Sequence, residues 1–285
     1  MDAEMVAVEP LTEQIRRAVA AGKLSLPPLP KIVTQLEQLL ADEQGVSSKQ
    51  VATLIRNEPA IAASLLRMAN SAAFGGLHPI SDLTQAIARL GFRQVSSVVT
   101  ALAHSSHFHS DDPAMKHWLE VLWGHAVATA LGARAVANLT AGDPEEAFMA
   151  GLLHDTGKLL VLKAVDYIEK DRKLAVVTPG VLDELMDILH AELGHRTLMD
   201  WHLPAPICDV ALRHHDKNLD LNDSLIIRVQ VADAIARKIG EHPKPKPDLD
   251  LLEVPAVEQL SLTDIELATL TVDLEDEIAE VKQLL

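Results

Sequence analysis

An all-α fold is predicted from three features of the 285-residue chain. Apolar residues make up 48% of the chain and aromatic residues only 3%, so the core must be built from small and unbranched side chains that favour helices over strands. Apolar residues recur at helical spacing in most segments, and no segment shows the sustained alternation of a half-buried strand. Glycine and proline separate the helical segments from one another.

Helical segments are expected first in the part of the chain before residue 112. A short helix over residues 10–22 ends at Gly22 and is followed by the rigid segment Leu26-Pro27-Pro28-Leu29-Pro30. Ser81 is the expected N-cap of a helix that Gly91 closes. The remaining helices of this part are expected at residues 32–40, 51–55, 59–70 and 92–107.

The second part contains longer helical segments. Asp143-Pro144-Glu145-Glu146 is a clear helix start, because it combines a capping residue, a proline in the first turn and acids that favour the helix dipole. The run Pro243-Lys244-Pro245-Lys246-Pro247 predicts an extended linker, and the capping box Thr263-x-x-Glu266 opens a final helix continuing toward Leu285. The other helices are expected at residues 114–139, 144–163, 180–201, 205–215 and 223–240.

The charge and the cysteine content restrict the partners and the compartment. A formal net charge of −16 argues against direct binding to nucleic acid and favours metals or proteins as partners. The lone Cys208 excludes an internal disulfide and fits a reducing compartment. The first residues do not have the pattern of a signal peptide, and no apolar run reaches the roughly 20 residues of a membrane span. We therefore expect a soluble, cytoplasmic protein without a membrane partner.

His154 and Asp155 are the strongest candidates for a chemical role. They interrupt the apolar segment GLLHDTGKLLVL, where two adjacent polar side chains are costly to bury without partners. An imidazole and a carboxylate are suitable ligands for a divalent metal, and Lys158 follows one turn later, where it could bind an anion. The alternative is a hydrogen-bonded pair at a helix end.

Further histidines and an aspartate lie on predicted helices with apolar flanks. Each of them taken alone is more often a satisfied core or surface group than a metal ligand. These residues are His125, His190, His214, His215 and Asp233. A second cluster, His104, His107 and His109, has a spacing that suits a metal but is equally well explained by solvated residues at the end of a helix.

Several motifs occur in an order that resembles a known family. LPPLP, NEPAIAASLLRMANSAAFG and PISDLTQAIARLG resemble the first half of HDOD (HD-related output) domains, and AFMAGLLHDTGKLLV, HAELG and RHHD resemble the second half. The resemblance covers roughly residues 24–240. It implies an all-α, HD-domain-like helical bundle with an N-terminal helical lobe, similar to HD hydrolases and to HD-GYP phosphodiesterases of cyclic di-nucleotides.

The implied domain organisation has three parts. An N-terminal helix spans residues 1–23, and the HDOD domain spans residues 24–242, with a first helical lobe at 24–112 and an HD-like lobe at 113–242. Residues 243–285 form the Pro-rich linker and the C-terminal helix.

The resemblance also implies a metal site and marks where this chain departs from its relatives. It implies one or two divalent ions (Fe, Mn, Zn, Ni or Mg) and assigns a catalytic role to Lys158. Between Asp216 and Ser224 the chain lacks the Gly-Tyr-Pro loop of the HD-GYP enzymes, and Val121 replaces a carboxylate that some relatives carry, so no third ion is expected. The implied metal ligands are His125, His154, Asp155, His190, His214, His215 and Asp233.

Two functions follow from these observations. The first is a bacterial signal-transduction output or regulatory domain that acts through interactions with signalling proteins and carries a metal site. The alternative is a metal-dependent phosphohydrolase or phosphodiesterase of the HD superfamily. The complete ligand set favours metal binding, but similarity of fold alone does not transfer an activity.

Overall fold

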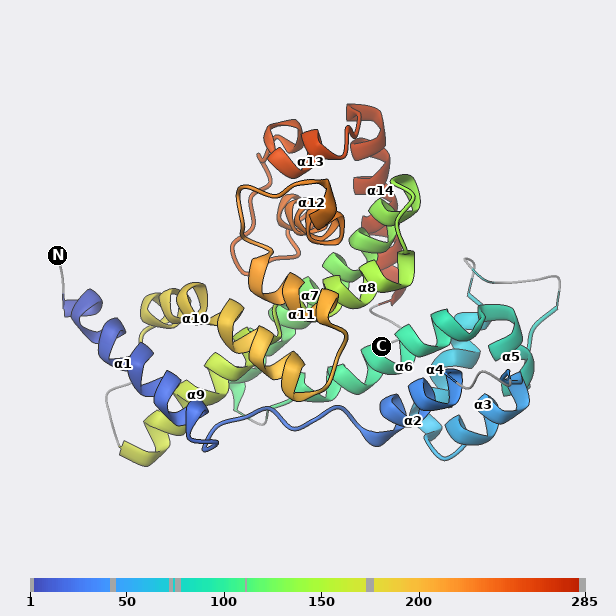
Figure 1. Ribbon diagram of the computed structural model, residues 1–285, viewed down its shortest axis with the longest axis horizontal. Coiled ribbons are helices and arrows are strands. Elements are labelled where there is room, and N and C mark those ends of the chain that lie inside the picture. Colours follow the sequence, from blue (N-terminus) through green and yellow to red (C-terminus); the bar gives the residue numbers. More distant parts are fainter. Residues whose placement is uncertain are drawn as a thin grey trace. The chain divides into compact units, whose positions relative to one another are not determined.

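The computed structural model of the protein describes residues 3–41, 45–71, 74, 78–110, 112–172 and 177–281 (Figure 1). Over these residues it contains α-helices and short 3-10 helices and no strand, which confirms the predicted all-α fold. The chain divides into two compact units. One comprises Met1–Pro28 and His107–Leu274, and the other comprises Leu29–Ser106 and Glu275–Leu285.

The unit containing residues 29–106 is a small helical bundle with its own core. Leu36, Ile55, Leu65 and Ile87 are completely buried in it. One detail of the prediction is wrong: the helix before Gly91 is capped by Asp82, whose side chain accepts a hydrogen bond from the backbone of Gln85, and not by Ser81. The helices of this unit are α2 (Lys31–Leu40), α3 (Ser48–Ile55), α4 (Pro59–Ala69), α5 (Leu83–Leu90) and α6 (Phe92–Ser105).

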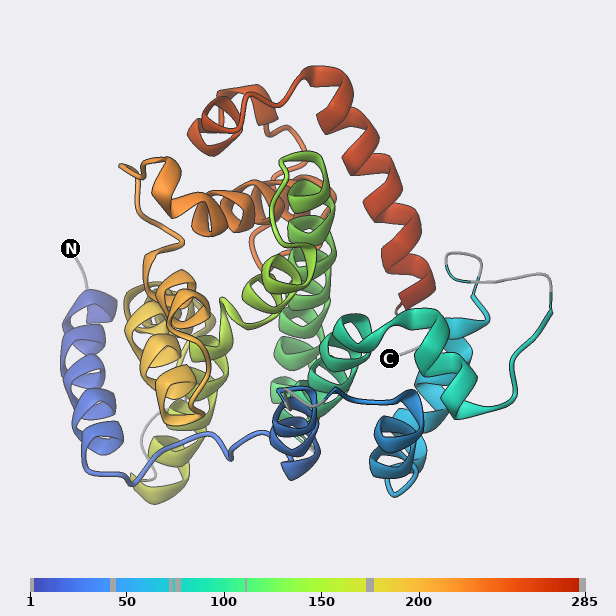
Figure 2. The same cartoon turned by 45° about the vertical axis from the view of Figure 1, so that its right-hand side comes forward.

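The larger unit is built around the long helix α7 (Pro113–Leu139), which packs against α8 (Pro144–Leu153) and α12 (Ser224–Lys238). A second layer contains α9 (Thr156–Arg172) and α10 (Pro179–Asp200), and α1 (Ala3–Ala20) lies along α10 in both views (Figure 2). The remaining elements are α11 (Ala205–Arg213), α13 (Pro255–Gln259), α14 (Asp264–Val281) and the 3-10 helices η1 (Ser106–Phe108), η2 (Leu221–Asp223) and η3 (Leu251–Glu253).

Helix ends follow the predicted capping chemistry at two places. Asp143 accepts hydrogen bonds from the backbone N–H groups of Glu145 and Glu146 at the start of α8. Thr263 and Glu266 form the expected capping box, in which each side chain bonds the backbone N–H of the other. The expected continuation of α14 toward Leu285 includes residues 282–285, which lie outside the described residues. Among the helices that are described, none has the length and apolar character needed to cross a bilayer.

The predicted single helix over residues 144–163 is wrong. Helix α8 ends at Leu153 and α9 begins at Thr156, with His154 and Asp155 in a turn between them. Apolar residues continue through both helices at similar spacing, so periodicity alone could not reveal the break. Both polar residues therefore lie between two helices and not within one.

A glycine allows the two helices of the second layer to touch. A Cβ atom added to Gly157 of α9 would lie 1.9 Å from the carbonyl oxygen of His190 and 2.6 Å from the backbone nitrogen of Gly194, both on α10. Only a residue without a side chain permits this approach. The contact fixes His190 relative to the turn that carries Asp155.

Candidate metal centre

Five parts of the larger unit bring the seven predicted ligand residues close together. His125 lies on α7, the pair His154-Asp155 in the turn after α8, and His190 on α10. The doublet His214-His215 follows α11, and Asp233 lies on α12. We call these seven residues the metal centre. His125, His154, His190 and His214 are buried, with at most 5% of each residue exposed.

The first group of the centre surrounds the Nε2 atom of His125. This atom lies 3.2 Å from Nε2 of His154 and 3.3 Å from both Oδ2 of Asp155 and Oδ1 of Asp233. Nε2 of His154 is 3.4 Å from Oδ2 of Asp155. Two atoms bonded to one ion at about 2.0–2.2 Å lie about 3.0–3.5 Å apart. The spacing of His125, His154 and Asp155 therefore suits three ligands of a single ion, and Asp233 adjoins them through Nε2 of His125.

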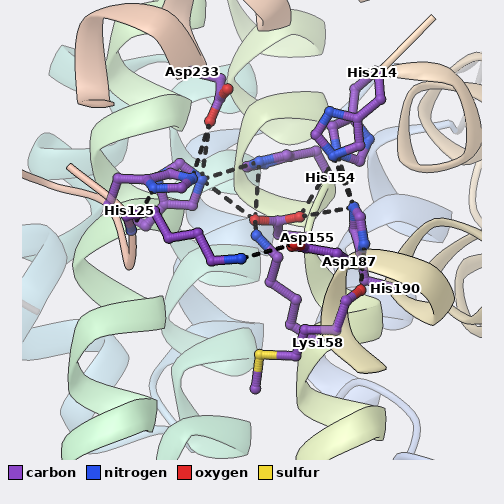
Figure 3. Close-up of polar contacts among 12 residues, drawn as sticks. His125, His154, Asp155, Lys158, Asp187, His190, His214 and Asp233 are labelled. Carbon is purple, nitrogen blue, oxygen red and sulfur yellow. Dashed lines mark hydrogen bonds and ion pairs between the residues drawn. The ribbon is translucent and has the colours of Figure 1, made fainter. Parts of the chain in front are cut away.

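The second group surrounds Nε2 of His190. This atom lies 3.0 Å from Nε2 of His215 and 3.3 Å from Nε2 of His214. Oδ1 of Asp155 is 3.7 Å from Nε2 of both His190 and His214. Figure 3 shows the Asp155 carboxylate between the two groups, with one oxygen toward each. The buried Oδ1 atom accepts no hydrogen bond among the described residues, so a second ion would give it a partner.

Backbone carbonyls fix the tautomers of four of these histidines. Nδ1 of His125 lies 2.9 Å from the carbonyl oxygen of Glu241, and Nδ1 of His154 lies 2.7 Å from that of Gly151. The rings of His190 and His214 make the same kind of contact with carbonyls in the preceding turns of their own helices. Because a carbonyl only accepts, each Nδ1 carries the proton, and each neutral ring has its lone pair on Nε2.

These tautomers make the centre a receptor for cations. Facing Nε2 atoms place lone pair against lone pair at 3.0–3.3 Å. That arrangement is favourable only with a positive charge between the rings, which a proton or a metal ion supplies. The donor set therefore fits divalent metals that accept imidazole and carboxylate ligands.

Burial and charge shift the pKa values of the centre in different directions. Burial opposes ionisation of Asp155, but Lys158 and His154 outweigh it and hold the pKa of this carboxyl well below its ordinary value. Burial, together with the neighbouring histidines, holds the pKa of His214 well below its ordinary value. Burial also lowers the pKa of His190, and that of His215 to about 4. These three rings are neutral, as ligands must be, at physiological pH.

His154 is the exception among the histidines. Its burial disfavours the charged ring, yet the carboxylate of Asp155 outweighs burial and raises the pKa of His154. Without a metal ion, the carboxylates of Asp155 and Asp233 thus stabilise a proton on His154. Metal binding and protonation compete for this position.

Lys158 contacts the centre through its charge. Its Nζ atom lies 2.5 Å from Oδ2 of Asp155, and only 8% of the residue is exposed. The lysine was predicted to bind an anion one turn after His154, whereas here its ammonium group is paired with the bridging carboxylate. The pair balances part of the negative charge that Asp155 and Asp233 bring together.

A pocket of about 390 Å³ opens beside the centre. His214, His215 and Asp233 contribute to its lining, as do three cationic residues, Lys217, Arg237 and Lys246. The lining also includes apolar side chains, among them Leu249 and Val254. The pocket therefore combines access to the ligand atoms with positive charge in a strongly acidic chain.

Sequence reasoning missed two residues next to Asp233. Arg237 lies one turn later on α12, with Nε 3.2 Å from Oδ2 of Asp233, and i,i+4 spacing was the available signal. His242 lies after α12, with Nε2 3.9 Å from Oδ1 of Asp233. The sequence places it only as the last residue before the predicted Pro-rich linker, because nothing in the sequence shows the chain turning back toward α7.

The alternative histidine cluster is not among the ligand groups formed by the described residues, which contain none of His104, His107 and His109. Nε2 of His107 instead lies 2.9 Å from the carbonyl oxygen of Pro27, and its ring stacks on Trp201 at 5.2 Å between ring centroids. His107 therefore connects two segments within the larger unit, the one that ends at Pro28 and the one that begins at His107 itself.

Known proteins resemble the chain in sequence and fold. An uncharacterized protein of Treponema pallidum (strain Nichols) is 27% identical over 221 residues, which are 74% of this chain and 42% of that protein. The chain thus spans less than half the length of this relative.

Two solved structures show the same fold. A protein of Shewanella amazonensis SB2B, provisionally named a metal-dependent phosphohydrolase, superposes with a TM-score of 0.79 at 22% identity over 95% of this chain and 97% of its own. An HDOD domain protein of unknown function from Geobacter sulfurreducens gives a TM-score of 0.70 at 22% identity, over 97% of each chain. The sequence profile of the HDOD domain matches residues 26–217, about two thirds of the chain. The protein therefore belongs to the HDOD domain family.

Proposed function

We propose that the protein binds two divalent metal ions and hydrolyses a phosphate ester at the metal centre. The observation that supports this most directly is the arrangement around Asp155: its two oxygens face two sets of Nε2 lone pairs beside an open pocket. His125, His154, Asp155 and Asp233 would hold one ion. Asp155, His190, His214 and His215 would hold the other.

The ligand types narrow the choice of metal. Five imidazoles and two carboxylates suit Zn, Fe, Ni or Mn better than Mg, which prefers oxygen ligands. When bound, such ions polarise a phosphoryl oxygen and acidify a coordinated water. The facing Nε2 atoms of each group support this choice, because imidazole nitrogens are good ligands of these metals.

The pocket supports an anionic substrate with an apolar part. Lys217, Arg237 and Lys246 offer charge to a phosphate, and the apolar lining residues, among them Leu249 and Val254, offer surface to the rest of the molecule. In hydrolysis the oxygen of a water bonds to phosphorus, the ester P–O bond breaks, and a proton passes to the leaving alcohol. Lys158, beside Asp155, would stabilise negative charge on the phosphoryl group.

The chain does not carry the feature expected for cyclic di-nucleotides. Residues 217–223 read KNLDLND and have no counterpart of the Gly-Tyr-Pro loop of the HD-GYP relatives. A generic phosphodiester is therefore a better substrate than cyclic di-GMP. The name of the Shewanella protein agrees with a phosphohydrolase but was given to a protein only 22% identical to this one.

A regulatory function is the second candidate, and one observation favours it. The unit at residues 29–106 has its own core and contributes none of the seven residues of the centre. A signalling partner that bound this unit would leave the metal centre in place. In that case the metal ions stabilise the larger unit and need not turn over a substrate.

Substitution of Asp155 tests the catalytic proposal. Asp155→Asn keeps the size of the side chain but removes the bridging charge, so the protein is expected to lose most bound metal and all hydrolysis of bis(p-nitrophenyl) phosphate. Metal content is measured by mass spectrometry after purification without chelator, and hydrolysis is followed with added Mn²⁺. His117→Gln, on the exposed surface of α7, is the matched control and should change neither quantity.

Three outcomes separate the candidates. Metal bound by the wild type without hydrolysis of any ester supports the regulatory function and contradicts the catalytic one. Efficient hydrolysis of cyclic di-GMP, lost in Asp155→Asn, shows that the substrate class proposed here is wrong. A wild type that binds no divalent ion contradicts both.

A further inference from the structure

His242 reaches the metal centre and, like Asp233, lies beyond the residues that match the family. It lies four residues beyond the end of α12, whereas the family match ends at residue 217. Its side chain is 4% exposed, its ring meets that of His125 edge-on with 4.6 Å between centroids, and its Nε2 lies 3.9 Å from Oδ1 of Asp233. By proximity alone, His125, Asp233 and His242 could form a third ligand group.

The hydrogen bonds of His242 contradict a ligand role. Its Nδ1 atom lies 2.7 Å from the backbone nitrogen of Lys244, and that N–H can only donate. Nδ1 therefore holds the lone pair, and the neutral ring carries its proton on Nε2. This is the reverse of His125, His154, His190 and His214, where Nδ1 donates to a carbonyl and Nε2 keeps the lone pair.

We infer that His242 is a positioning residue that donates a hydrogen bond from Nε2 to Asp233 and does not bind the metal itself. Nε2 is buried and has no hydrogen-bond partner among the described residues, and a buried N–H without an acceptor is unfavourable. Oδ1 of Asp233, at 3.9 Å, is the acceptor that a small rotation of the carboxylate would bring into range. The inference rests on the proposed metal binding, because it concerns how Asp233 is held for an ion.

Asp233 would then be oriented from both sides. Arg237 contacts its Oδ2 atom at 3.2 Å, and His242 faces its Oδ1 atom, which also approaches Nε2 of His125. Outer partners of this kind set the direction of a ligand and typically contribute 10- to 100-fold to metal affinity. The same segment also supplies the carbonyl of Glu241 to Nδ1 of His125.

The chain around His242 keeps the ring in place. Pro243 restricts the backbone between His242 and its partner Lys244. Nζ of Lys244 lies 2.8 Å from Oδ2 of Asp187 on α10. This ion pair attaches the segment after α12 to α10. The segment after α12 thus holds partners of His125 and Asp233 in place.

The tautomer provides a direct test that needs no metal and no substrate. Two-bond ¹H–¹⁵N spectra of histidine-labelled, metal-free protein distinguish Nδ1–H from Nε2–H rings, and the His242 signals are identified by their absence in His242→Gln. We expect Nε2–H for His242 and Nδ1–H for His125 and His190. On addition of Zn²⁺, His242 should keep its tautomer. An Nδ1–H tautomer of His242, or coordination of its Nε2 by zinc, overturns the inference.

Metal affinity measures the positioning effect. His242→Leu removes the donor and should weaken binding of the weaker-held ion by 10- to 100-fold in calorimetric titrations with Zn²⁺. His242→Gln offers an amide N–H of similar reach and should bind within a few-fold of the wild type, as should the control His117→Gln. Equal affinity of the Leu variant and the wild type overturns the positioning role.

The two proposals fail in different ways. If the wild type binds no zinc, the proposed function is wrong and the positioning role falls with it, while the tautomer assignment is judged on the metal-free spectra alone. If the wild type binds zinc and His242→Gln loses affinity as strongly as His242→Leu, His242 is a ligand and only the further inference is wrong.

Discussion

At the scale of single residues, the centre depends on histidines that are kept neutral by burial. His190, His214 and His215 have lowered pKa values, and only His154 has a raised one. In the unfolded chain each ring has a pKa of about 6.5. Acid therefore protonates the unfolded state before it protonates these three rings in the folded state.

The sign of the pH dependence follows from this difference. A lowered folded pKa gives stability that is present above about pH 6.5 and is lost as the pH falls toward the folded value, which is about 4 for His215. His154 acts in the opposite direction but is one ring against three. The unfolding temperature of chelator-treated protein should therefore fall between pH 7 and pH 4.5, measured by circular dichroism.

A variant isolates the contribution of one ring. His214→Gln removes a buried titrating group, so its unfolding temperature should depend less steeply on pH than that of the wild type. A wild-type protein that becomes more stable on acidification would show that His154 dominates and that this argument is wrong.

The sequence could predict the ligand residues only in part. His154 and Asp155 interrupt an apolar segment, and the other five predicted positions came from the resemblance to HD-type proteins. His242 and Glu241 had no such signal, since one lies beside a Pro-rich linker and the other acts through its backbone carbonyl. Contacts made by a returning segment depend on tertiary structure, which a local pattern does not encode.

At the scale of elements, the geometry depends on the turn at His154-Asp155 and on the contact between α9 and α10. Asp155 directly precedes α9, where a carboxylate is favoured by the helix dipole. Helix starts such as the one at Asp143 were predictable because capping chemistry is local. The break before Thr156 was not, because apolar residues run through it without a proline and Gly157 lies inside the next helix.

Replacement of Gly157 by alanine should disrupt this contact. The new Cβ atom would overlap the carbonyl oxygen of His190, so α9 and α10 must separate. We expect a loss of about 1–3 kcal/mol in the free energy of unfolding and weaker metal binding, because His190 moves away from His214. Urea titration and metal analysis measure the two effects.

The matched control is a second helical glycine. A Cβ atom added to Gly180, near the start of α10, meets no atom within 4 Å. Gly180→Ala should be neutral or stabilising by up to about 1 kcal/mol and should leave metal binding unchanged. If Gly157→Ala behaves like Gly180→Ala, the close contact of α9 and α10 does not hold the centre together.

At the scale of the whole molecule, all residues of the centre belong to the unit of Met1–Pro28 and His107–Leu274. The division of the HDOD domain into residues 24–112 and 113–242 stays a prediction.

The two ends of the larger unit between which residues 29–106 are inserted lie close together, because Nε2 of His107 is 2.9 Å from the carbonyl oxygen of Pro27. A short bridge could therefore replace the insertion.

Excision of the smaller unit tests whether the larger one is self-sufficient. In a chain that joins residues 1–28 to 107–274 by a short Gly-Ser linker, we expect helical circular dichroism and the same number of bound ions as in the intact protein. The reason is that the core and ligands of the larger unit lie in the retained residues. An unfolded product, or a folded one without metal, would show that residues 29–106 are required for the centre.

The carbonyl contacts of the histidines bear on how fast ions enter. Because Nδ1 of His154, His190 and His214 is held by carbonyls in the preceding turn, the rings already point inward without a cation. Uptake then requires no refolding, and its slow step becomes the loss of water from the incoming ion. Association rates should rank by the lability of each hydrated cation, with Zn²⁺ and Mn²⁺ fast and Mg²⁺, which gives up water reluctantly, slow.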